Sequence, residues 1–131
     1  MRELSIGEVA RETGMSASAL RYYEKSGLLP AAPRRSRQRR YDDSIFGRIG
    51  LIRLARDAGF TISETRTFLS GFSAETPPAV RWRVLAARKL EEIERLMARA
   101  RRMKALLEAS FRCRCLTLSD CERYLGERYR P

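Results

Sequence analysis

The three cysteines of the chain, Cys113, Cys115 and Cys121, lie within nine residues of one another in the stretch FRCRCLTLSDCER. Thiolates bind soft metal ions and react with oxidants or other thiols. The chain opens with the charged stretch MRELSIGEVA instead of the apolar run of a secretory signal, so we expect a reducing, cytoplasmic setting. The cluster therefore predicts metal binding or redox chemistry in preference to a disulfide scaffold.

The overall composition narrows the class of protein. There are 27 Lys and Arg residues against 16 Asp and Glu, a net charge of +11, which favours a polyanionic partner such as nucleic acid. The chain has no histidine, which excludes a histidine-based catalytic triad and a histidine-containing zinc site. No segment approaches the length of a membrane span, and no glycine-rich phosphate loop is present, so we expect neither a membrane protein nor an enzyme.

Two short helices are predicted near the N-terminus. Ser5 and Glu8 have the spacing of a capping box, and Gly14 ends the first helix. Ser16 is a suitable N-cap for the second helix, which ends at Gly27. Two short helices joined by about three residues predict a helix-turn-helix, whose second helix enters the major groove of DNA. The candidate contacts on that helix are Ser16, Ser18, Arg21, Tyr22 and Tyr23.

The segment after these helices breaks the helical pattern. It contains two prolines, and five of the seven residues 34–40 are arginine. We interpret it as a loop with short flanking strands, a wing that contacts the DNA backbone or the minor groove. The candidate contacts on the wing are Arg37, Arg39, Arg40 and Tyr41. A basic loop that is only solvated is the alternative.

A long helix is predicted from Pro78 to Glu108, where neither glycine nor proline interrupts. Before it, a helix is predicted with Ile45, Ile49, Ile52 and Leu54 as its apolar residues and Gly59 as its stop. A second capping box from Thr61 to Glu64 and a hinge at residues 72–78 separate the two helices. One narrow apolar stripe runs along the long helix, formed by Ala86, Leu90, Ile93, Met97, Ala100, Met103 and Leu107. A helix of roughly 45 Å cannot bury such a stripe in a small head, so we expect a homodimer. A helix folded back on the head is the alternative.

The fold class predicted is mostly α, with a winged helix-turn-helix head, a long dimerisation helix and a short C-terminal cysteine loop and helix. The segments IGEVARETGMSASALRYYEKSGLL, RQRRY and ARDAGFTISE together resemble the MerR family of transcriptional regulators. RQRRY, Trp82 and CRCLTLSDC are most similar to its SoxR-like branch. The corresponding domains are residues 1–74 for DNA binding, 75–109 for dimerisation and 110–131 for the effector loop.

The resemblance implies a mechanism as well as a fold. MerR-like regulators are homodimers joined by antiparallel long helices. They bind a palindromic operator inside a promoter, and the effector lets them bend and untwist the DNA so that RNA polymerase can use it. We therefore expect a promoter-distorting transcription activator that responds to metal or redox state. The alternative is an effector-independent regulator or architectural DNA-binding protein with a vestigial cysteine loop.

The resemblance also suggests occupants for the cysteine loop. SoxR-like proteins hold a [2Fe–2S] cluster with four cysteines, and here Ser110 stands at the place of the first one. Copper sensors of the family use two cysteines eight positions apart, as Cys113 and Cys121 are. Zn could take three thiolates and a fourth ligand, for which Asp120 and Glu122 are candidates. Metal-free redox switching is the remaining option, and a capping box from Ser119 to Glu122 predicts Cys121 as the most reactive thiol.

Overall fold

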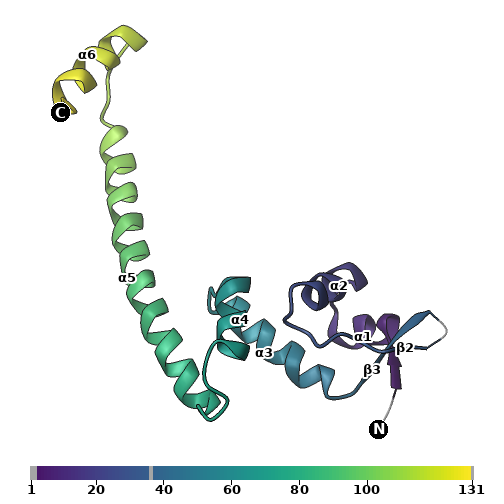
Figure 1. Ribbon diagram of the computed structural model, residues 1–131. Helices are drawn as coiled ribbons and strands as arrows, with labels where there is room; N and C mark the ends of the chain where they lie inside the picture. The colour runs from purple at the N-terminus through teal and green to yellow at the C-terminus, as the bar shows by residue number, and fades with distance from the viewer. Residues whose placement is uncertain (1–2, 36, 131) are drawn as a thin grey trace. The chain divides into compact units, whose positions relative to one another are not determined.

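The computed structural model of the protein describes residues 3–35 and 37–130 (Figure 1). The chain divides into two compact units, residues 1–90 and residues 91–131. The elements, in chain order, are β1 (Glu3–Ser5), α1 (Ile6–Thr13), α2 (Ala17–Lys25), β2 (Arg34–Arg35), β3 (Gln38–Asp42), α3 (Ile45–Asp57), α4 (Ile62–Ser70), α5 (Pro78–Ser110) and α6 (Leu118–Arg128). The predicted fold class is confirmed, because a small winged unit is followed by one long helix and a short one.

The helix boundaries follow from local chemistry. Two of the three predicted capping boxes are present. Ser5 and Glu8 exchange side-chain-to-backbone hydrogen bonds of 3.2 and 3.1 Å, and Thr61 and Glu64 do the same at 3.1 and 2.9 Å. Gly14 ends α1 in the left-handed conformation, with φ of 74°. The N-cap of α2 is Ser16, whose hydroxyl accepts the N–H of Ala19 at 3.1 Å.

The wing is a three-stranded antiparallel sheet with the order β1-β3-β2. The hairpin between β2 and β3 pairs Arg35 with Gln38, and Arg37 at its tip has a positive φ of 67°. The third strand, β1, was not predicted from the sequence. It pairs Leu4 with Tyr41 in the sheet and buries Leu4 in the core.

Two hydrophobic clusters hold the first unit together. The larger is centred on Leu4, Val9, Leu20, Leu28 and Ile49, all almost completely buried. Each such side chain contributes about 1.5–3 kcal/mol by burial. The second cluster joins α3, α4 and the start of α5 through Ala55, Phe60, Phe68 and Leu85, with Trp82 packed against it. Of the apolar residues noted in α3, Ile45, Ile49 and Ile52 are buried. Leu54 is 58% exposed, and Ala55 is the buried residue of that turn.

The long helix α5 begins at Pro78 as predicted and ends two residues later than predicted. Its stripe is exposed in the single chain: Leu90, Met97, Met103 and Leu107 are all more than 40% exposed. Among the described residues, no helix has the length and apolar character that a membrane span needs.

Candidate nucleic-acid interface and cysteine cluster

The second helix of the helix-turn-helix, α2, divides its predicted contact residues between surface and core. Ser16, Ser18 and Arg21 are exposed, and the hydroxyls of the two serines lie 3.1 Å apart. Tyr22 is 55% exposed, whereas Tyr23 is buried and accepts a hydrogen bond from Arg56 at 3.5 Å. The exposed face of α2 therefore carries two hydroxyls, a guanidinium and a phenol.

The wing residues divide in the same way. Arg34 and Arg37 are exposed, and Arg40 is half-buried with its guanidinium donating to the side chain of Gln38 at 3.3 Å. Tyr41 is only 4% exposed. Tyr41 was a candidate contact, but it is buried because side chains alternate between the two faces of β3. Of the pair Tyr22–Tyr23, one ring was expected in the core and the other near a phosphate, and Tyr23 is the buried one.

One carboxylate joins the wing to α2. Glu24 accepts the Tyr41 hydroxyl at 2.9 Å and lies 3.2 Å from the Nε of Arg39. Burial, followed by the hydrogen bond to Glu24, raises the pKa of Tyr41 to about 12, so its phenol keeps its proton as a donor. Glu24 was not singled out in the sequence, because residues 15 and 17 positions apart give no local signal of contact.

A further group of basic residues was missed by sequence reasoning. Four arginines of α3 and α4 donate to the helix-turn-helix: Arg48 to the Leu28 carbonyl, Arg53 to the Thr13 carbonyl, Arg56 to the Tyr23 hydroxyl and Arg66 to the Ser26 carbonyl. Two of these carbonyls belong to the C-terminal ends of α1 and α2, where a cation satisfies free acceptors and the helix dipole. Part of the positive charge is therefore committed to holding the two helices in place.

The three cysteines come together at the end of α5. Their sulfur atoms all lie within 4.8 Å of one another, with Cys113 and Cys115 exposed and Cys121 half-buried. Three thiolates around one zinc-sized ion have sulfur atoms about 3.8 Å apart, given a Zn–S distance of about 2.3 Å. The spacing fits a three-thiolate metal site after a small closure of the loop.

One prediction about the loop is corrected, and the reactivity of Cys121 stays a prediction. The N-cap of α6 is Thr117, whose hydroxyl accepts the N–H of Asp120 at 3.2 Å, so the predicted capping box from Ser119 to Glu122 is wrong. The lowered thiol pKa belongs to Cys113, because the backbone N–H of Cys115, and then its thiol, donate to the Cys113 sulfur. The pKa of Cys115 is raised to about 11, chiefly because its proton is held in that bond.

The place of a fourth cysteine is taken by a residue with a different role. The Ser110 hydroxyl donates to the Leu107 carbonyl at 2.6 Å, which ties it to the last turn of α5. Asp120, a candidate fourth ligand, lies 3.9 Å from the guanidinium of Arg123. A four-cysteine [2Fe–2S] site does not fit these residues, whereas a site of three thiolates does.

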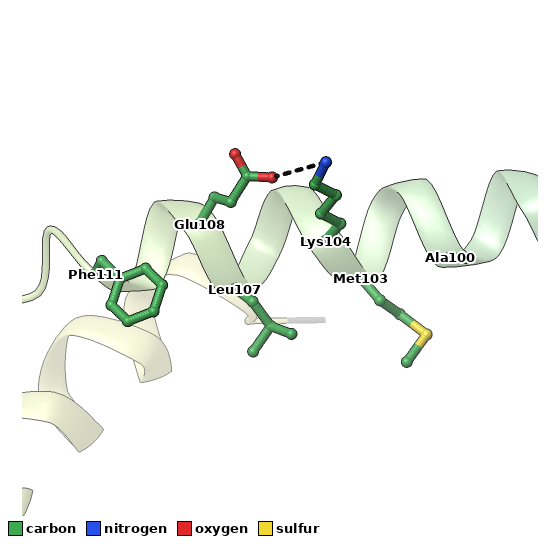
Figure 2. Close-up of a pocket in the computed structure, with 6 residues that line it drawn as sticks. All are labelled: Ala100, Met103, Lys104, Leu107, Glu108 and Phe111. Atoms are coloured by element: carbon green, nitrogen blue, oxygen red, sulfur yellow. Dashed lines mark ion pairs between the residues drawn. The ribbon is translucent and has the colours of Figure 1, made fainter.

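Beside the cysteine loop, the last turns of α5 carry an apolar groove lined by Ala100, Met103, Leu107 and Phe111 (Figure 2). Met103 and Leu107 point to one side of the helix, and the Lys104–Glu108 ion pair, at 3.9 Å, lies on another (Figure 2). The groove continues the exposed stripe to the end of α5.

Comparison with known proteins identifies the family to which the chain is similar. Residues 4–71 match the family described as MerR HTH family regulatory protein, and residues 46–109 match the family described as MerR, DNA binding. The HTH-type transcriptional activator SoxR homolog of Chromobacterium violaceum is 34% identical over 123 residues, which cover 92% of this chain and 82% of the relative. Heavy metal-dependent transcription regulator 2 of Rhizobium meliloti is 29% identical over 106 residues, covering 80% of this chain and 72% of the relative.

Solved structures show the same fold. The N-terminal part of MtaN, the Bacillus subtilis multidrug transporter activator, superposes with a TM-score of 0.69 at 21% identity, covering 84% of this chain and 99% of that one. HiNmlR, a MerR-family regulator lacking the sensor domain and bound to promoter DNA, has a TM-score of 0.55 at 23% identity, covering 95% of this chain and 96% of that one. The winged helix-turn-helix, the long helix and these sequence matches together show that the chain belongs to the MerR family of DNA-binding transcription regulators.

Proposed function

We propose that the protein is a homodimeric, promoter-distorting transcription activator that binds a palindromic operator and responds to a soft metal ion or to redox state through its three cysteines. The observation that carries the proposal is the triad of sulfur atoms within 4.8 Å, placed at the end of the helix whose apolar stripe is exposed. RNA polymerase at the same promoter, in the cytoplasm, is the partner that this activity requires.

DNA contact is assigned to exposed and half-buried polar and basic side chains of α2 and the wing, Arg39 and Arg40 being the half-buried ones. On α2 these are Ser16, Ser18, Arg21 and Tyr22, and on the wing they are Arg37, Arg39 and Arg40. Short hydroxyl side chains permit a close approach to base edges, and arginine pairs with guanine or phosphate. Tyr23 and Tyr41 are buried, so we assign them the role of positioning α2 and β3. Residues 1–74 form this DNA-binding segment.

Dimerisation is assigned to residues 75–109 in an antiparallel pair of α5 helices. The exposed stripe supplies the apolar seam. The charges along α5 favour the antiparallel direction, because an acidic stretch at 91–94 precedes a basic stretch at 99–104. In an antiparallel pair the acidic stretch of one helix faces the basic stretch of its partner, whereas a parallel pair would bring like charges together.

Sensing is assigned to residues 110–131. Cys113, Cys115 and Cys121 would hold Cu(I) or Zn, which prefer thiolate ligands, and a metal-bound thiolate cluster would order the loop. Alternatively, exchange with a disulfide oxidant would join two of the three thiols in a disulfide, release the oxidant as two thiols and leave the third cysteine reduced. Either event would change the conformation of the loop beside the apolar groove of α5, and so could alter the packing of the two α5 helices in the dimer.

An experiment on the full chain tests the proposal. The operator is selected from a randomised duplex pool, and open-complex formation by RNA polymerase on that operator is followed with Cu(I), Zn or a disulfide oxidant. We expect one of these three to stimulate open-complex formation severalfold, and the triple variant Cys113→Ser, Cys115→Ser, Cys121→Ser to bind DNA equally well without responding.

A lack of response to metal and oxidant would contradict the sensing role. A protein that binds the selected operator but shows no change in open-complex formation with metal or oxidant, and no metal in anaerobically purified samples, is an effector-independent or architectural DNA-binding protein. In that case the cysteine loop is vestigial and the sensing role is wrong.

A further inference from the structure

The start of α5 carries a buried cation that the proposed functions leave unexplained. Lys89 is only 6% exposed, and its Nζ lies 2.9 Å from Oε1 of Glu64 and 5.3 Å from the centre of the Phe60 ring. A lysine loses its hydration when it is buried. The charged form of Lys89 is therefore stabilised by the carboxylate and the aromatic face that take the place of water.

The partner oxygen performs a second task. Oε1 of Glu64 also accepts the backbone N–H of Thr61 at 2.9 Å, which closes the capping box at the N-terminal end of α4. The same atom therefore joins Lys89 on α5 to the first turn of α4. Any displacement of Lys89 relative to α4 disturbs this cap.

The other end of α4 is held by a second cation from α5. Arg81 donates to the carbonyls of Phe68 and Leu69 at 3.2 and 3.3 Å, and to those of Thr76 and Ser73 at 2.9 and 3.3 Å. Phe68 and Leu69 belong to the last turn of α4, where free carbonyls and the negative end of the helix dipole attract a guanidinium.

The two cations lie on one face of α5. Arg81, Leu85 and Lys89 follow at intervals of four residues, and Leu85, between the two cations, is 5% exposed. Trp82 packs beside them against Phe60 and Phe68, with ring centres 5.2 and 5.7 Å apart. A rigid rod attached at two points about 12 Å apart along its axis, at about 1.5 Å per residue, cannot pivot about either one.

We infer that Arg81 and Lys89 are positioning residues that clamp α5 to both ends of α4 and thereby fix the distance and rotation between the two DNA-binding units of the dimer. Together they determine which separation of operator half-sites the protein accepts. This inference rests on the proposed antiparallel dimer. Half-sites read by a dimer must match its geometry, because one base pair of insertion moves a half-site along the duplex and rotates it about the axis.

The test is a spacing profile measured with the full chain. Affinities are measured by fluorescence anisotropy on the selected operator and on duplexes whose half-sites are moved by one or two base pairs in either direction. We expect Lys89→Met to reduce the preference of the wild type for its best spacing at least fivefold, with unchanged affinity for a single half-site. Lys89→Arg should keep the wild-type profile, because it retains the charge.

Two further variants make the result decisive. Arg95→Met removes an exposed cation from the same helix, outside the apolar stripe and the two charged stretches, and should leave the profile unchanged. Arg81→Lys keeps the charge but cannot span the carbonyls that the guanidinium reaches, so it should broaden the profile even if Lys89→Met fails to fold. A folded Arg81→Lys or Lys89→Met protein with the wild-type spacing preference would overturn the clamp. A wild-type protein that sediments as a monomer would instead overturn the proposed dimer.

Discussion

Several charged residues of this protein hold other side chains in position. Glu24 is the clearest example in the DNA-binding unit, because it binds both Arg39 and Tyr41 and so ties β3 to α2. The side chain of Glu24 is only 14% exposed, and charge-assisted hydrogen bonds are strong in such a sheltered environment. The placement of the wing arginines therefore depends on an acidic residue.

We expect Glu24→Gln to weaken operator binding roughly tenfold, since loss of a charge-assisted contact of about 1.5 kcal/mol would leave Arg39 poorly oriented. Fluorescence anisotropy on the selected operator measures the effect. Asp57→Asn, which removes an exposed carboxylate at the end of α3, is the matched control and should bind as the wild type does. Equal binding by the Glu24 variant would show that the wing is oriented without this carboxylate.

The pH dependence of stability should report on Glu64. The backbone N–H of Thr61 and then the ammonium of Lys89 lower the pKa of Glu64 below its usual value of 4.5. Because the folded pKa lies below the unfolded one, the stabilisation is complete above pH 4.5 and is lost as the pH falls through the folded pKa. Glu64→Gln should be less stable by about 1–3 kcal/mol at pH 7, because glutamine can keep the cap but leaves the buried ammonium of Lys89 without its partner charge.

Urea unfolding of both proteins between pH 7 and pH 3 measures this difference. The gap between wild type and Glu64→Gln should narrow towards pH 3, since protonated Glu64 then resembles the neutral amide. A gap that stays constant across this range would contradict a charged Glu64 in the folded protein.

Residues whose roles depend on their own neighbours were predictable from the sequence. Ser5, Ser16 and Thr61 cap helices because their hydroxyls bond to backbone groups three residues away, and that spacing is visible in the sequence. The burial of Tyr41 and the role of Glu24 depend on contacts between segments far apart in the chain. The lowered pKa of Cys113 could not be predicted for a related reason, because it depends on which N–H group the loop turns towards its sulfur.

Among the elements, the wing carries the highest density of arginine, and its contribution to binding should be mainly electrostatic. Replacing Arg37 and Arg40 together with Ala should lower the slope of log affinity against log salt by about 2, since each phosphate contact contributes about 0.9. Arg128→Ala with Arg130→Ala removes the same charge from the C-terminal part of the chain and should change the slope little. An unchanged slope in the wing variant would show that these two arginines do not neutralise phosphates.

Long periodic elements were predicted well and short ones poorly. The stripe of α5 repeats over many turns, and its start at Pro78 follows from the restricted φ of proline. Strand β1 has three residues, too few to show an alternation, and it directly precedes a strong helix cap. The exposure of Leu54 could not be predicted, because the last part of α3 packs through the small Ala55, which leaves a weak apolar signal in the sequence.

For the whole molecule, the central expectation is association through α5. Met97→Glu places a charge in the middle of the stripe, where the side chain is 43% exposed in the single chain. We expect this variant to sediment as a monomer at concentrations where the wild type is a dimer, because a carboxylate buried in an apolar seam loses its hydration. Ala105→Glu adds the same charge away from the stripe and should remain dimeric. A dimeric Met97→Glu protein would place the contact elsewhere.

For the molecule as a whole, the sequence predicted that α5 needs a partner helix more readily than it predicted how α5 is attached to α4. An uninterrupted apolar stripe on a basic chain of 131 residues is a signal that composition and period alone reveal. The two-point attachment of α5 to α4 was not predictable, because it joins Lys89 to a carboxylate 25 positions away and Arg81 to main-chain carbonyls that any sequence would supply.

Under the proposed dimerisation through the exposed stripe of α5, operator occupancy should depend on the copy number of the protein in the cell. Where chains are scarce enough to be mainly monomeric, the amount of dimer rises with the square of their concentration. A twofold increase in synthesis would then raise the DNA-bound population up to about fourfold before saturation. Weakly dimerising variants would therefore convert a gradual change in expression into a sharper change at the promoter.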